Sequence, residues 1–436
     1  MQRTLTAILC LASVVSVNDV YATDNDWLHW RGPTANGCAA DTANPPVSWS
    51  QTQNVRWMQD LPGEGTSTPI VVGDRIFVLS AEDTNRRAAV VPPRDSRSKT
   101  IAPETLFRFM VTCVSRQTGR ILWQKTAVEE LPHEGHHPTH TYAGSSPTSD
   151  GKRIYVSFGS RGIYCYSLNG DLIWNKDLGD MRTRYGWGES VTPVIDGESL
   201  VINWDQEEDS YIACLDASSG NEKWKTSRPN EVTSWNTPLI TEFGGRKMVV
   251  ANGTHRVRAY DLADGKELWN CGGQTVNAIP SPLRVDNFVI AMSGYRGSLA
   301  AAIPLNSVGD VTQTDDIVWR HSRGTPYVPS PLLSGDRLFF TAGNRDILTV
   351  LNPRSGKVIG QPQRLSGIGS VYASPISANG HLYFLGREGT CVVLRDNDSL
   401  DVVSVNRIND ATDASPVAVG SDLIIRSRKT LYCFSQ

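Results

Sequence analysis

The sequence predicts an all-β fold, an eight-bladed β-propeller built from four-stranded antiparallel blades. A Ser or Thr followed by Pro opens a similar pattern of apolar runs and turns eight times along the chain. The 37 glycines and 24 prolines favour many short strands joined by turns. The last repeat lacks its final strand, and a matching segment precedes the first repeat. These three observations together favour a closed ring.

The repeat is the strongest of these signals. Its opening pairs are Thr68-Pro69, Ser146-Pro147, Thr192-Pro193, Thr237-Pro238, Ser281-Pro282, Ser330-Pro331, Ser374-Pro375 and Ser415-Pro416. Successive prolines lie 78, 46, 45, 44, 49, 44 and 41 residues apart, and the long first interval contains a polar insertion over residues 82–106. A fixed period of this length is typical of propellers and other repeat architectures.

Each repeat fits four short strands. In the fourth repeat we expect strands at 237–240, 247–251, 257–261 and 267–269. A glycine recurs in the turn before the last strand, because such tight turns need a positive φ. A single unit cannot bury both faces of its sheet, so the units must stack as blades of a ring.

The two ends of the chain complement each other. The eighth repeat stops at residues 431–434, the end of its third strand, while residues 54–57 match the strand that carries a tryptophan in other repeats. Pairing them would remove an exposed sheet edge. We therefore expect residues 54–436 to form one propeller, closed by its N-terminal strand and preceded by an arm over residues 23–53.

Residues 1–22 have the features of a signal peptide. A basic start is followed by an apolar stretch over residues 5–17, and Val20 and Ala22 supply small residues before a cleavage site. The stretch is too short to cross a bilayer core of ~30 Å. We predict cleavage after Ala22, export to the periplasm or the medium, and no transmembrane segment in the mature chain.

Charge and cysteine usage narrow the class of protein. The 42 basic and 45 acidic side chains give a net charge of −3, which provides no net electrostatic attraction to nucleic acid. Cys113, Cys165, Cys214 and Cys433 fall at the same point of the repeat. We therefore interpret them as small buried core residues and expect no disulfide framework.

A tryptophan recurs in the last strand of six repeats, at Trp57, Trp123, Trp174, Trp224, Trp269 and Trp319. Identical placement on the outermost strand indicates docking between neighbouring blades, although a ring of ligand-binding aromatics is the alternative. Gly360 and Ser404 occupy this position in the sixth and seventh repeats, so we expect those blades to dock less tightly.

These endings, with a turn, Gly, Lys and Trp followed by Ser-Pro, resemble pyrroloquinoline quinone (PQQ) type β-propeller repeats. The opening Trp27-Leu-His-Trp-Arg-Gly-Pro33 is similar to exported PQQ-binding-like β-propeller repeat proteins of planctomycete type. The resemblance covers nearly the whole mature chain and implies the propeller fold. The superfamily includes quinoprotein alcohol dehydrogenases and a lipoprotein of outer-membrane protein assembly, and one fold carries unrelated functions.

Strand alternation places the unusual residues on one face of the ring. The loops that lead into each first strand, called here the funnel loops, should surround the central channel. They mix aromatic, amide, guanidinium, imidazole and carboxylate groups, which an oriented small-ligand site needs. The predicted ligand-binding residues are His136, His137, His140, Arg184, Trp187, Glu189, Trp235, Asn236, Gln274, Asn277, Arg323, Tyr327, Tyr372 and Asp413.

The loops between the second and third strands open on the same face and carry a recurring arginine. It stands at Arg161, Arg256, Arg296, Arg345, Arg387 and Arg428. A guanidinium fork suits a carboxylate or a phosphate, which allows an anionic ligand or a glycan. Solvated hairpin tips are the alternative.

Half of the eight histidines lie between His133 and His140 in the second funnel loop. Imidazole is a common metal ligand, but spacing on a loop fixes no coordination geometry. We therefore expect these side chains to make hydrogen bonds and predict no metal site.

The resemblance to quinoprotein dehydrogenases raises the hypothesis of a PQQ-dependent oxidoreductase. Such an enzyme sandwiches the quinone between flat groups, holds calcium against it and supplies a carboxylate base, for which Glu189 and Asp413 are candidates. The adjacent cysteine pair that forms one side of the sandwich in that family does not occur in this sequence. The chain also lacks the long insertions that cover the cofactor there.

The leading hypothesis from the sequence is a non-catalytic exported propeller, for which the residues indicate no definite cofactor. It would bind a small molecule, a glycan or a protein at its funnel face, as a monomer. The PQQ-dependent dehydrogenase with calcium is one alternative, and a scaffold for envelope protein assembly is another.

Overall fold

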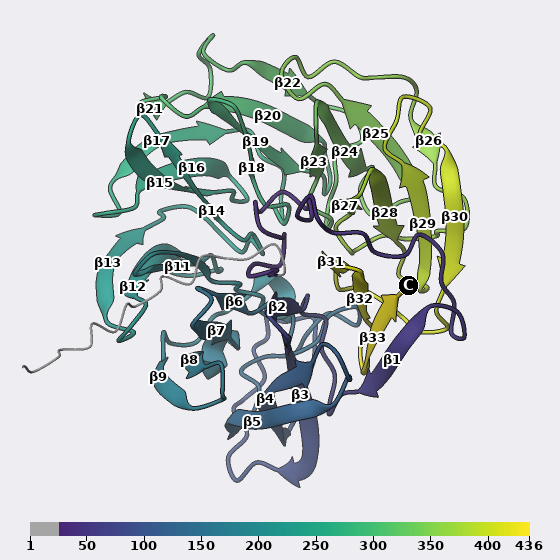
Figure 1. Cartoon of the computed structure of the whole chain (residues 1–436). Coiled ribbons are helices and arrows are strands. Elements are labelled where there is room, and N and C mark those ends of the chain that lie inside the picture. The colour runs from purple at the N-terminus through teal and green to yellow at the C-terminus, as the bar shows by residue number, and fades with distance from the viewer. Residues whose placement is uncertain (1–25) are drawn as a thin grey trace, which may run out of the picture.

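The computed structural model describes residues 26–436 and shows eight antiparallel sheets arranged as a ring (Figure 1). The predicted eight-bladed propeller is confirmed. Within the described range the helices are single 3-10 turns, η1 (Gly159–Arg161) and η2 (Arg184–Gly186). No helix in that range is long and apolar enough to cross a membrane. The predicted signal peptide, residues 1–22, lies outside the described residues.

The first four blades follow one another along the chain. Blade 1 consists of β2 (Ile70–Val72), β3 (Arg75–Arg87), β4 (Thr105–Ser115) and β5 (Ile121–Glu130). Blade 2 consists of β6 (Thr148–Ser149), β7 (Arg153–Ser157), β8 (Ile163–Ser167) and β9 (Leu172–Lys176). Blade 3 consists of β10 (Val194–Asp196), β11 (Ser199–Trp204), β12 (Tyr211–Asp216) and β13 (Glu222–Ser227). Blade 4 consists of β14 (Leu239–Phe243), β15 (Arg246–Ala251), β16 (Arg256–Asp261) and β17 (Glu267–Gly272).

The remaining blades complete the ring. Blade 5 consists of β18 (Leu283–Val285), β19 (Phe288–Ser293), β20 (Leu299–Pro304) and β22 (Trp319–His321). Blade 6 consists of β23 (Leu332–Ser334), β24 (Arg337–Thr341), β25 (Ile347–Leu351) and β26 (Gln363–Arg364). Blade 7 consists of β27 (Ile376–Ala378), β28 (His381–Leu385), β29 (Thr390–Arg395) and β30 (Val402–Arg407). Blade 8 consists of β31 (Val417–Val419), β32 (Asp422–Arg426), β33 (Thr430–Ser435) and β1 (Val55–Asp60). A short strand from the loop of blade 5, β21 (Gly309–Asp310), adds a parallel fifth strand to blade 4.

The ends of the chain close the ring as the sequence predicts. Strand β1 pairs antiparallel with β33, so that Trp57 faces Cys433 and Gln59 faces Leu431. Arg56 on β1 also forms an ion pair of 2.8 Å with the buried carboxylate of Asp422 in blade 8. The pairing leaves no open edge on β33.

The recurring tryptophans dock neighbouring blades. The indole N–H of Trp57 donates to the carbonyl of Arg116 in the next blade, and that of Trp174 donates to Ala217. A Cβ atom placed on Gly119 would collide with the ring of Trp57, so glycine lets the ring lie against the turn. The same indole and glycine contacts recur at Trp123, Trp174, Trp224 and Trp319. Trp269 differs, because the loop that carries β21 replaces the corresponding turn.

The recurring cysteines lie directly opposite these tryptophans. Cys113, Cys165 and Cys214 pair in register with Trp123, Trp174 and Trp224 across the two outer strands of their blades. Among the described residues every cysteine is free, and all but Cys38 are buried. The interpretation as small core residues is therefore confirmed.

The Ser/Thr-Pro pairs link the blades through a ring of hydrogen bonds around the channel. In six of the eight pairs the backbone N–H of the Ser or Thr donates to the hydroxyl of the corresponding pair in the next blade. These links run from Ser281 to Ser330 (2.9 Å), Ser330 to Ser374 (2.8 Å), Ser374 to Ser415 (3.0 Å), Ser415 to Thr68 (3.1 Å), Thr68 to Ser146 (2.9 Å) and Ser146 to Thr192 (3.0 Å). The hydroxyl ring thus satisfies buried donors that the channel would otherwise leave unpaired.

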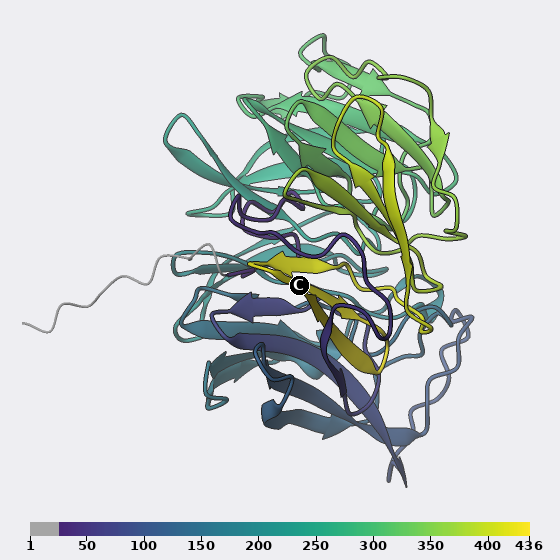
Figure 2. The same ribbon diagram turned by 45° about the vertical axis from the view of Figure 1, so that its right-hand side comes forward.

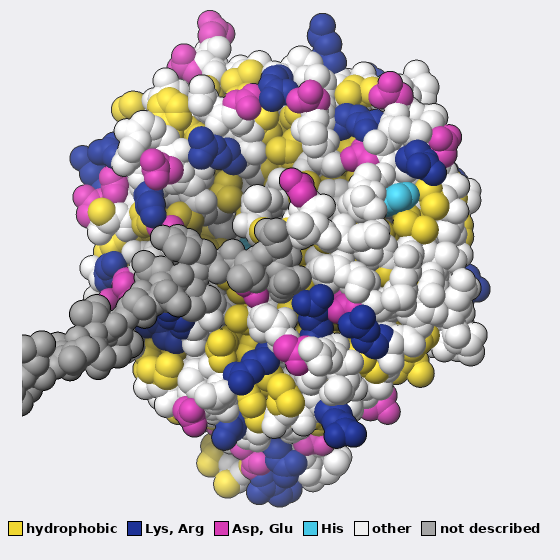
Figure 3. All heavy atoms as spheres, in the orientation of Figure 1, with side chains coloured by type: hydrophobic (Ala, Val, Ile, Leu, Met, Phe, Trp, Pro, Cys, Tyr) yellow, Lys and Arg dark blue, Asp and Glu magenta, His cyan; other side chains and the backbone are white. Residues whose placement is uncertain are grey.

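The arm crosses the centre of the ring on the face seen in Figure 1. Trp27 is fully buried and exchanges two backbone hydrogen bonds with Val71 of β2. Arg31 is also fully buried, and its guanidinium donates to the carbonyls of Pro331 and Pro375 at the inner strands of blades 6 and 7. The arm therefore plugs the channel at this end. Basic and acidic side chains are interspersed on the same face (Figure 3).

The end of the arm fills the position where blade 7 lacks its tryptophan. Trp49 stacks on Tyr383 of blade 7 and contacts Phe434 of blade 8 at ring distances of 6.2 and 5.6 Å. Ser404, which stands at the tryptophan position, donates to the carbonyl of Val47. The looser docking expected for blade 7 is not what the structure shows, because a tryptophan from outside the repeat occupies the gap.

Replacing Ser374 by Ala should lower the stability of the ring by about 1–3 kcal/mol, because the buried N–H of Ser330 would lose its acceptor. Ser374→Thr keeps a hydroxyl of the kind found at Thr68 and Thr192, and is the matched control. Chemical denaturation measures both variants. Equal stability of Ser374→Ala and the parent protein would show that the hydroxyl ring contributes nothing.

Candidate functional site

The funnel loops of all eight blades meet around one cavity of about 350 Å³ at the mouth of the channel, away from the arm. Its wall consists of Thr66, His137, Thr139, His140, Gly144, Trp187, Ser190, Trp235, Ile279, Tyr295, Tyr327, Val328, Tyr372 and Asp413. These residues are distant in the sequence and are brought together only by ring closure. Because the arm plugs the other end, the cavity opens on one face.

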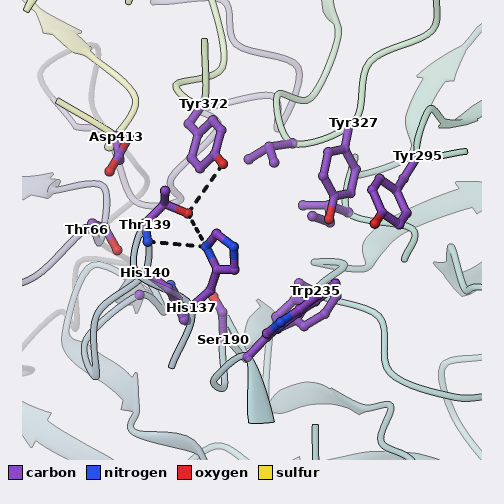
Figure 4. Close-up of a pocket in the computed structure, with 14 residues that line it drawn as sticks. Thr66, His137, Thr139, His140, Ser190, Trp235, Tyr295, Tyr327, Tyr372 and Asp413 are labelled. Carbon is purple, nitrogen blue, oxygen red and sulfur yellow. Dashed lines mark hydrogen bonds between the residues drawn. The ribbon is translucent and has the colours of Figure 1, made fainter. Parts of the chain in front are cut away.

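Aromatic rings dominate the wall (Figure 4). Trp187 and Trp235 stack with ring centroids 6.4 Å apart, and the indole N–H of Trp235 donates to the carbonyl of Gly188. Tyr295 and Tyr327 form a second stack at 4.7 Å. Burial raises the pKa of Tyr327 to about 12, so its hydroxyl stays protonated and able to donate. Flat apolar faces with hydroxyl edges suit a ligand that has both a flat side and polar groups.

A chain of polar groups occupies the opposite part of the wall. The hydroxyl of Thr139 lies 3.3 Å from that of Tyr372 and 2.7 Å from Nδ1 of His137, as Figure 4 shows. Burial and the nearby charge of Arg387 lower the pKa of His137. Burial lowers the pKa of His140 to about 4, and its Nε2 contacts the carbonyl of Glu189 at 3.0 Å. Both imidazoles are therefore neutral at pH 7.

Asp413 is the one carboxylate in the cavity wall, and it is already paired. Arg387 donates to its two oxygens at 2.6 and 3.2 Å, and Arg428 lies 3.8 Å away. The Arg387 guanidinium also stacks on the ring of Tyr372 at 4.0 Å. This bidentate pair fixes the carboxylate and offsets its charge, which makes it a weak candidate for a free base.

The structure places half of the predicted binding residues in the wall and the rest elsewhere. His137, His140, Trp187, Trp235, Tyr327, Tyr372 and Asp413 line the cavity. His136, Arg184, Glu189, Asn236, Gln274, Asn277 and Arg323 do not. Side chains of a strand alternate between its two faces, but those of an irregular loop do not. The sequence therefore could not show which side chains of a funnel loop point into the cavity.

Two of the residues outside the wall have clear structural roles. The carboxyl group of Glu189 lies beneath the wall, where it accepts hydrogen bonds from the backbone N–H and the hydroxyl of Ser160. Asn236 is buried and donates to the carbonyl of Pro280, while its own oxygen accepts from the N–H of Asn252. Neither side chain is available to a ligand in the cavity.

The sequence prediction missed part of the wall. Thr66, Thr139, Ser190, Ile279 and Val328 stand in the funnel loops beside residues that were predicted. Tyr295 comes from the loop between the second and third strands of blade 5, directly before the recurring arginine at position 296. The aromatic residue next to the recurring arginine was the feature of the sequence that could have indicated that this loop also contributes to the wall.

The insertion of blade 1 supports one part of the wall from outside. It lengthens β3 and β4 into a ribbon that projects from the ring (Figure 2), and its loop packs on the funnel loop of blade 3. The N–H of Lys99 donates to the carbonyl of Tyr185 at 2.9 Å, and the Lys99 ammonium lies 3.9 Å from the ring of Tyr185. Thr100 donates to Gly186, which directly precedes Trp187. The insertion therefore holds the loop that presents Trp187, and a second cavity of about 550 Å³ lies beneath it.

The comparisons with known proteins identify the class of repeat. A family profile described as outer membrane protein assembly factor BamB, of the PQQ repeat type, matches residues 108–361, which is more than half of the chain. The chain therefore belongs to the PQQ-like β-propeller repeat family. No curated protein matches it.

Solved structures of several functional classes share the fold. A europium-containing methanol dehydrogenase has a TM-score of 0.66 at 8% identity, covering 95% of this chain and 98% of its own. The quinohemoprotein alcohol dehydrogenase of Comamonas testosteroni has a TM-score of 0.62 at 10% identity, covering 95% and 81%. BamB of Moraxella catarrhalis has a TM-score of 0.53 at 14% identity, covering 80% and 100%. At such low identity the likeness shows the fold alone.

The cavity wall does not fit calcium-bound PQQ. The quinone carries three carboxylates, yet the wall contains no lysine or arginine, and Arg184 and Arg323 lie outside it. The single carboxylate that could face a calcium ion is held by Arg387. Over residues 26–436 no cluster of three or more His, Cys, Asp or Glu side chains could hold a metal ion. The histidines of the second funnel loop instead contact separate partners.

The buried carboxyl group of Glu189 should make stability depend on pH. Burial and, to a smaller extent, the neighbouring Glu134 raise its pKa to about 8, while the hydrogen bonds from Ser160 and the charge of Arg161 act in the opposite direction. A carboxyl group that is protonated when folded and ionised when unfolded favours unfolding as pH rises from about 4.5 to about 8, by at most about 1.4 kcal/mol per pH unit. The melting temperature of Glu189→Gln should change less over this interval than that of the parent protein. Parallel curves for the two proteins would contradict the assigned pKa.

Proposed function

We propose that this protein is an exported, non-catalytic binding module that takes a small ligand into the funnel cavity. The observation that carries the proposal is the one-ended cavity of about 350 Å³ with five aromatic side chains from the funnel-face loops of five blades. Binding sites of soluble proteins are concave and mostly apolar, with a few placed polar groups. Residues on loops over a rigid scaffold are the usual location of such sites.

The polar groups of the wall support binding better than catalysis. Glu189 lies beneath the wall on Ser160, and Asp413 is paired with Arg387. The two candidate bases are therefore committed to structural contacts. The tyrosine hydroxyls, Thr139 and neutral His137 remain as donors and acceptors that can orient a ligand. Export is inferred from the predicted signal peptide. Residues 23–53 are proposed to form the arm, and residues 54–436 the propeller domain.

The binding proposal can be tested by saturation-transfer NMR with named probes. We would use D-glucose, N-acetyl-D-glucosamine, D-glucuronate and benzoate against the full mature chain. At least one probe should receive saturation, and Trp235→Ala should weaken its binding about tenfold, equivalent to about 1.4 kcal/mol, because half of one aromatic stack is removed. Phe243→Ala, at the end of β14 away from the funnel, is the control and should bind as the parent protein does.

Trp235→Ala also removes a hydrogen bond to the carbonyl of Gly188, so the variant could lose stability as well as affinity. Melting curves of the variants show whether each remains folded. Tyr327→Phe removes only a hydroxyl and provides a second variant that keeps the aromatic face. The proposal fails if no probe binds, or if binding is equal in the parent protein and both cavity variants.

A reconstitution experiment separates this proposal from the dehydrogenase alternative. The protein would be incubated with PQQ and calcium and assayed for alcohol-dependent reduction of an artificial dye. We expect no activity above the protein-free control, because the wall lacks cations for the quinone carboxylates and its carboxylate is paired. Dye reduction that requires PQQ and calcium, and that Asp413→Asn abolishes, would instead establish a quinoprotein dehydrogenase.

A further inference from the structure

One stretch of the funnel mouth carries polar groups that the protein itself does not satisfy. We call it the blade-5 rim, and it consists of Gln274, Thr275, Asn277 and Arg296. Both amide atoms of Gln274 and the hydroxyl of Thr275 are buried without a hydrogen-bond partner. Asn277 is 1% exposed, and its amide also makes no hydrogen bond of normal geometry, although it interacts with the Tyr327 hydroxyl of the cavity wall.

Such groups are costly unless something pairs with them. An unsatisfied buried polar group costs about 1–3 kcal/mol, and buried amides are rarely left unpaired. The funnel loops of blades 3 and 4 do not show the pattern, since the hydroxyls of Thr183 and Thr233 have partners. The rim therefore gathers several unpaired hydrogen-bond donors and acceptors beside the cavity.

The backbone of the rim is also strained. Asn277 and Arg296 have φ values of 58° and 53°, in the left-handed region that residues other than glycine seldom adopt. Conformations of this kind persist where the surrounding structure fixes them, and they concentrate at binding and catalytic sites. Here they bring an amide and a guanidinium to the same side of the funnel mouth.

Arg296 supplies a charge without a counter-ion. No carboxylate of residues 26–436 lies within ion-pair distance of its guanidinium, which is exposed and stacks on the ring of Tyr295 at 5.3 Å. Tyr295 in turn stacks on Tyr327 in the wall. Four of the five other arginines at the same loop position, Arg161, Arg256, Arg387 and Arg428, form ion pairs, whereas Arg345 in blade 6 forms none with any described residue.

We propose that the blade-5 rim is a subsite for a sugar acid, whose carboxylate binds Arg296 and whose hydroxyls bind Gln274, Thr275 and Asn277. This inference rests on the proposed function and names the ligand class of the same funnel. The pyranose ring would lie in the cavity, where its C–H faces pack on the aromatic side chains.

The chemistry of the rim favours this class over other anions. A guanidinium fork matches a carboxylate in geometry, and amide groups pair with hydroxyls as both donors and acceptors. A single free charge at the rim suits one carboxylate better than a doubly charged phosphate. The wall does not repel an anion, because its one carboxylate is offset by Arg387 and its imidazoles are neutral.

Calorimetric titration with two matched sugars tests the inference. D-glucuronate and D-glucose differ by the carboxylate, so at low ionic strength the parent protein should bind D-glucuronate at least about tenfold more tightly. Arg296→Gln should reduce the affinity for D-glucuronate to that for D-glucose. Arg395→Gln, at the exposed end of β29 in blade 7, removes the same charge elsewhere and should change neither affinity.

A second variant tests the amide groups separately from the charge. Gln274→Ala should weaken both sugars by a similar factor, because it removes contacts to hydroxyls that the two share. Melting temperatures of the variants verify that each remains folded.

The outcomes separate this inference from the proposed function. Equal affinity of the parent protein for the two sugars, or an Arg296→Gln variant that still prefers D-glucuronate, overturns the sugar-acid subsite and leaves funnel binding intact. If only benzoate or N-acetyl-D-glucosamine binds, and Trp235→Ala abolishes that binding, the sugar-acid subsite is likewise overturned and binding in the funnel stands. Failure of every probe in the panel overturns the proposed function and the subsite together.

Discussion

The hydrogen bonds between Ser/Thr-Pro pairs are the constraint on which the rest of this structure depends. In six of the eight pairs the hydroxyl accepts a hydrogen bond from the backbone N–H of the neighbouring blade, while the following proline has no N–H to satisfy. The chain is therefore tied to the channel at the point where each funnel loop ends. Because the same tie recurs in successive blades, loops from distant parts of the sequence meet around a single mouth. Between blades 3 and 5 these hydrogen bonds are absent, and the side chains of Asn236 and Asn252 instead both donate to the carbonyl of Pro280. The blade-5 rim, with its unsatisfied amides, lies beside this interruption.

Two segments outside the repeat give the ring its asymmetry. The arm inserts Arg31 between the inner strands and places Trp49 where blade 7 lacks its own docking residue. The insertion of blade 1 lies on the other face and holds the loop before Trp187. One segment closes the channel and the other shapes the wall of the cavity. A regular ring of blades would be open at both ends, whereas this one has a single mouth. That difference turns a repeat architecture into a candidate binding site.

The cavity shows why membership of a repeat family does not settle chemistry. The fold is shared with dehydrogenases and with an outer-membrane assembly factor, and the differences lie in funnel loops that the repeat leaves free to vary. In this chain the loops supply aromatic faces, neutral imidazoles and a paired carboxylate. Such a wall favours recognition of a ligand through its shape and hydroxyl groups. The unpaired charge that we propose selects among ligands is that of Arg296, which lies at the rim and not inside the cavity.

The sequence alone determined the number of blades, the closing strand, the docking role of the tryptophans and the burial of the cysteines, because these follow from periodic spacing that each blade repeats. It also identified the funnel loops and half of the cavity wall. It did not determine that Glu189 turns beneath the wall, that Asp413 is neutralised by Arg387, or that Tyr295 joins the cavity from another loop. Those facts depend on side-chain directions in irregular loops and on contacts between the loops of neighbouring blades. Periodic spacing carries no information about either, so only the tertiary structure decided them.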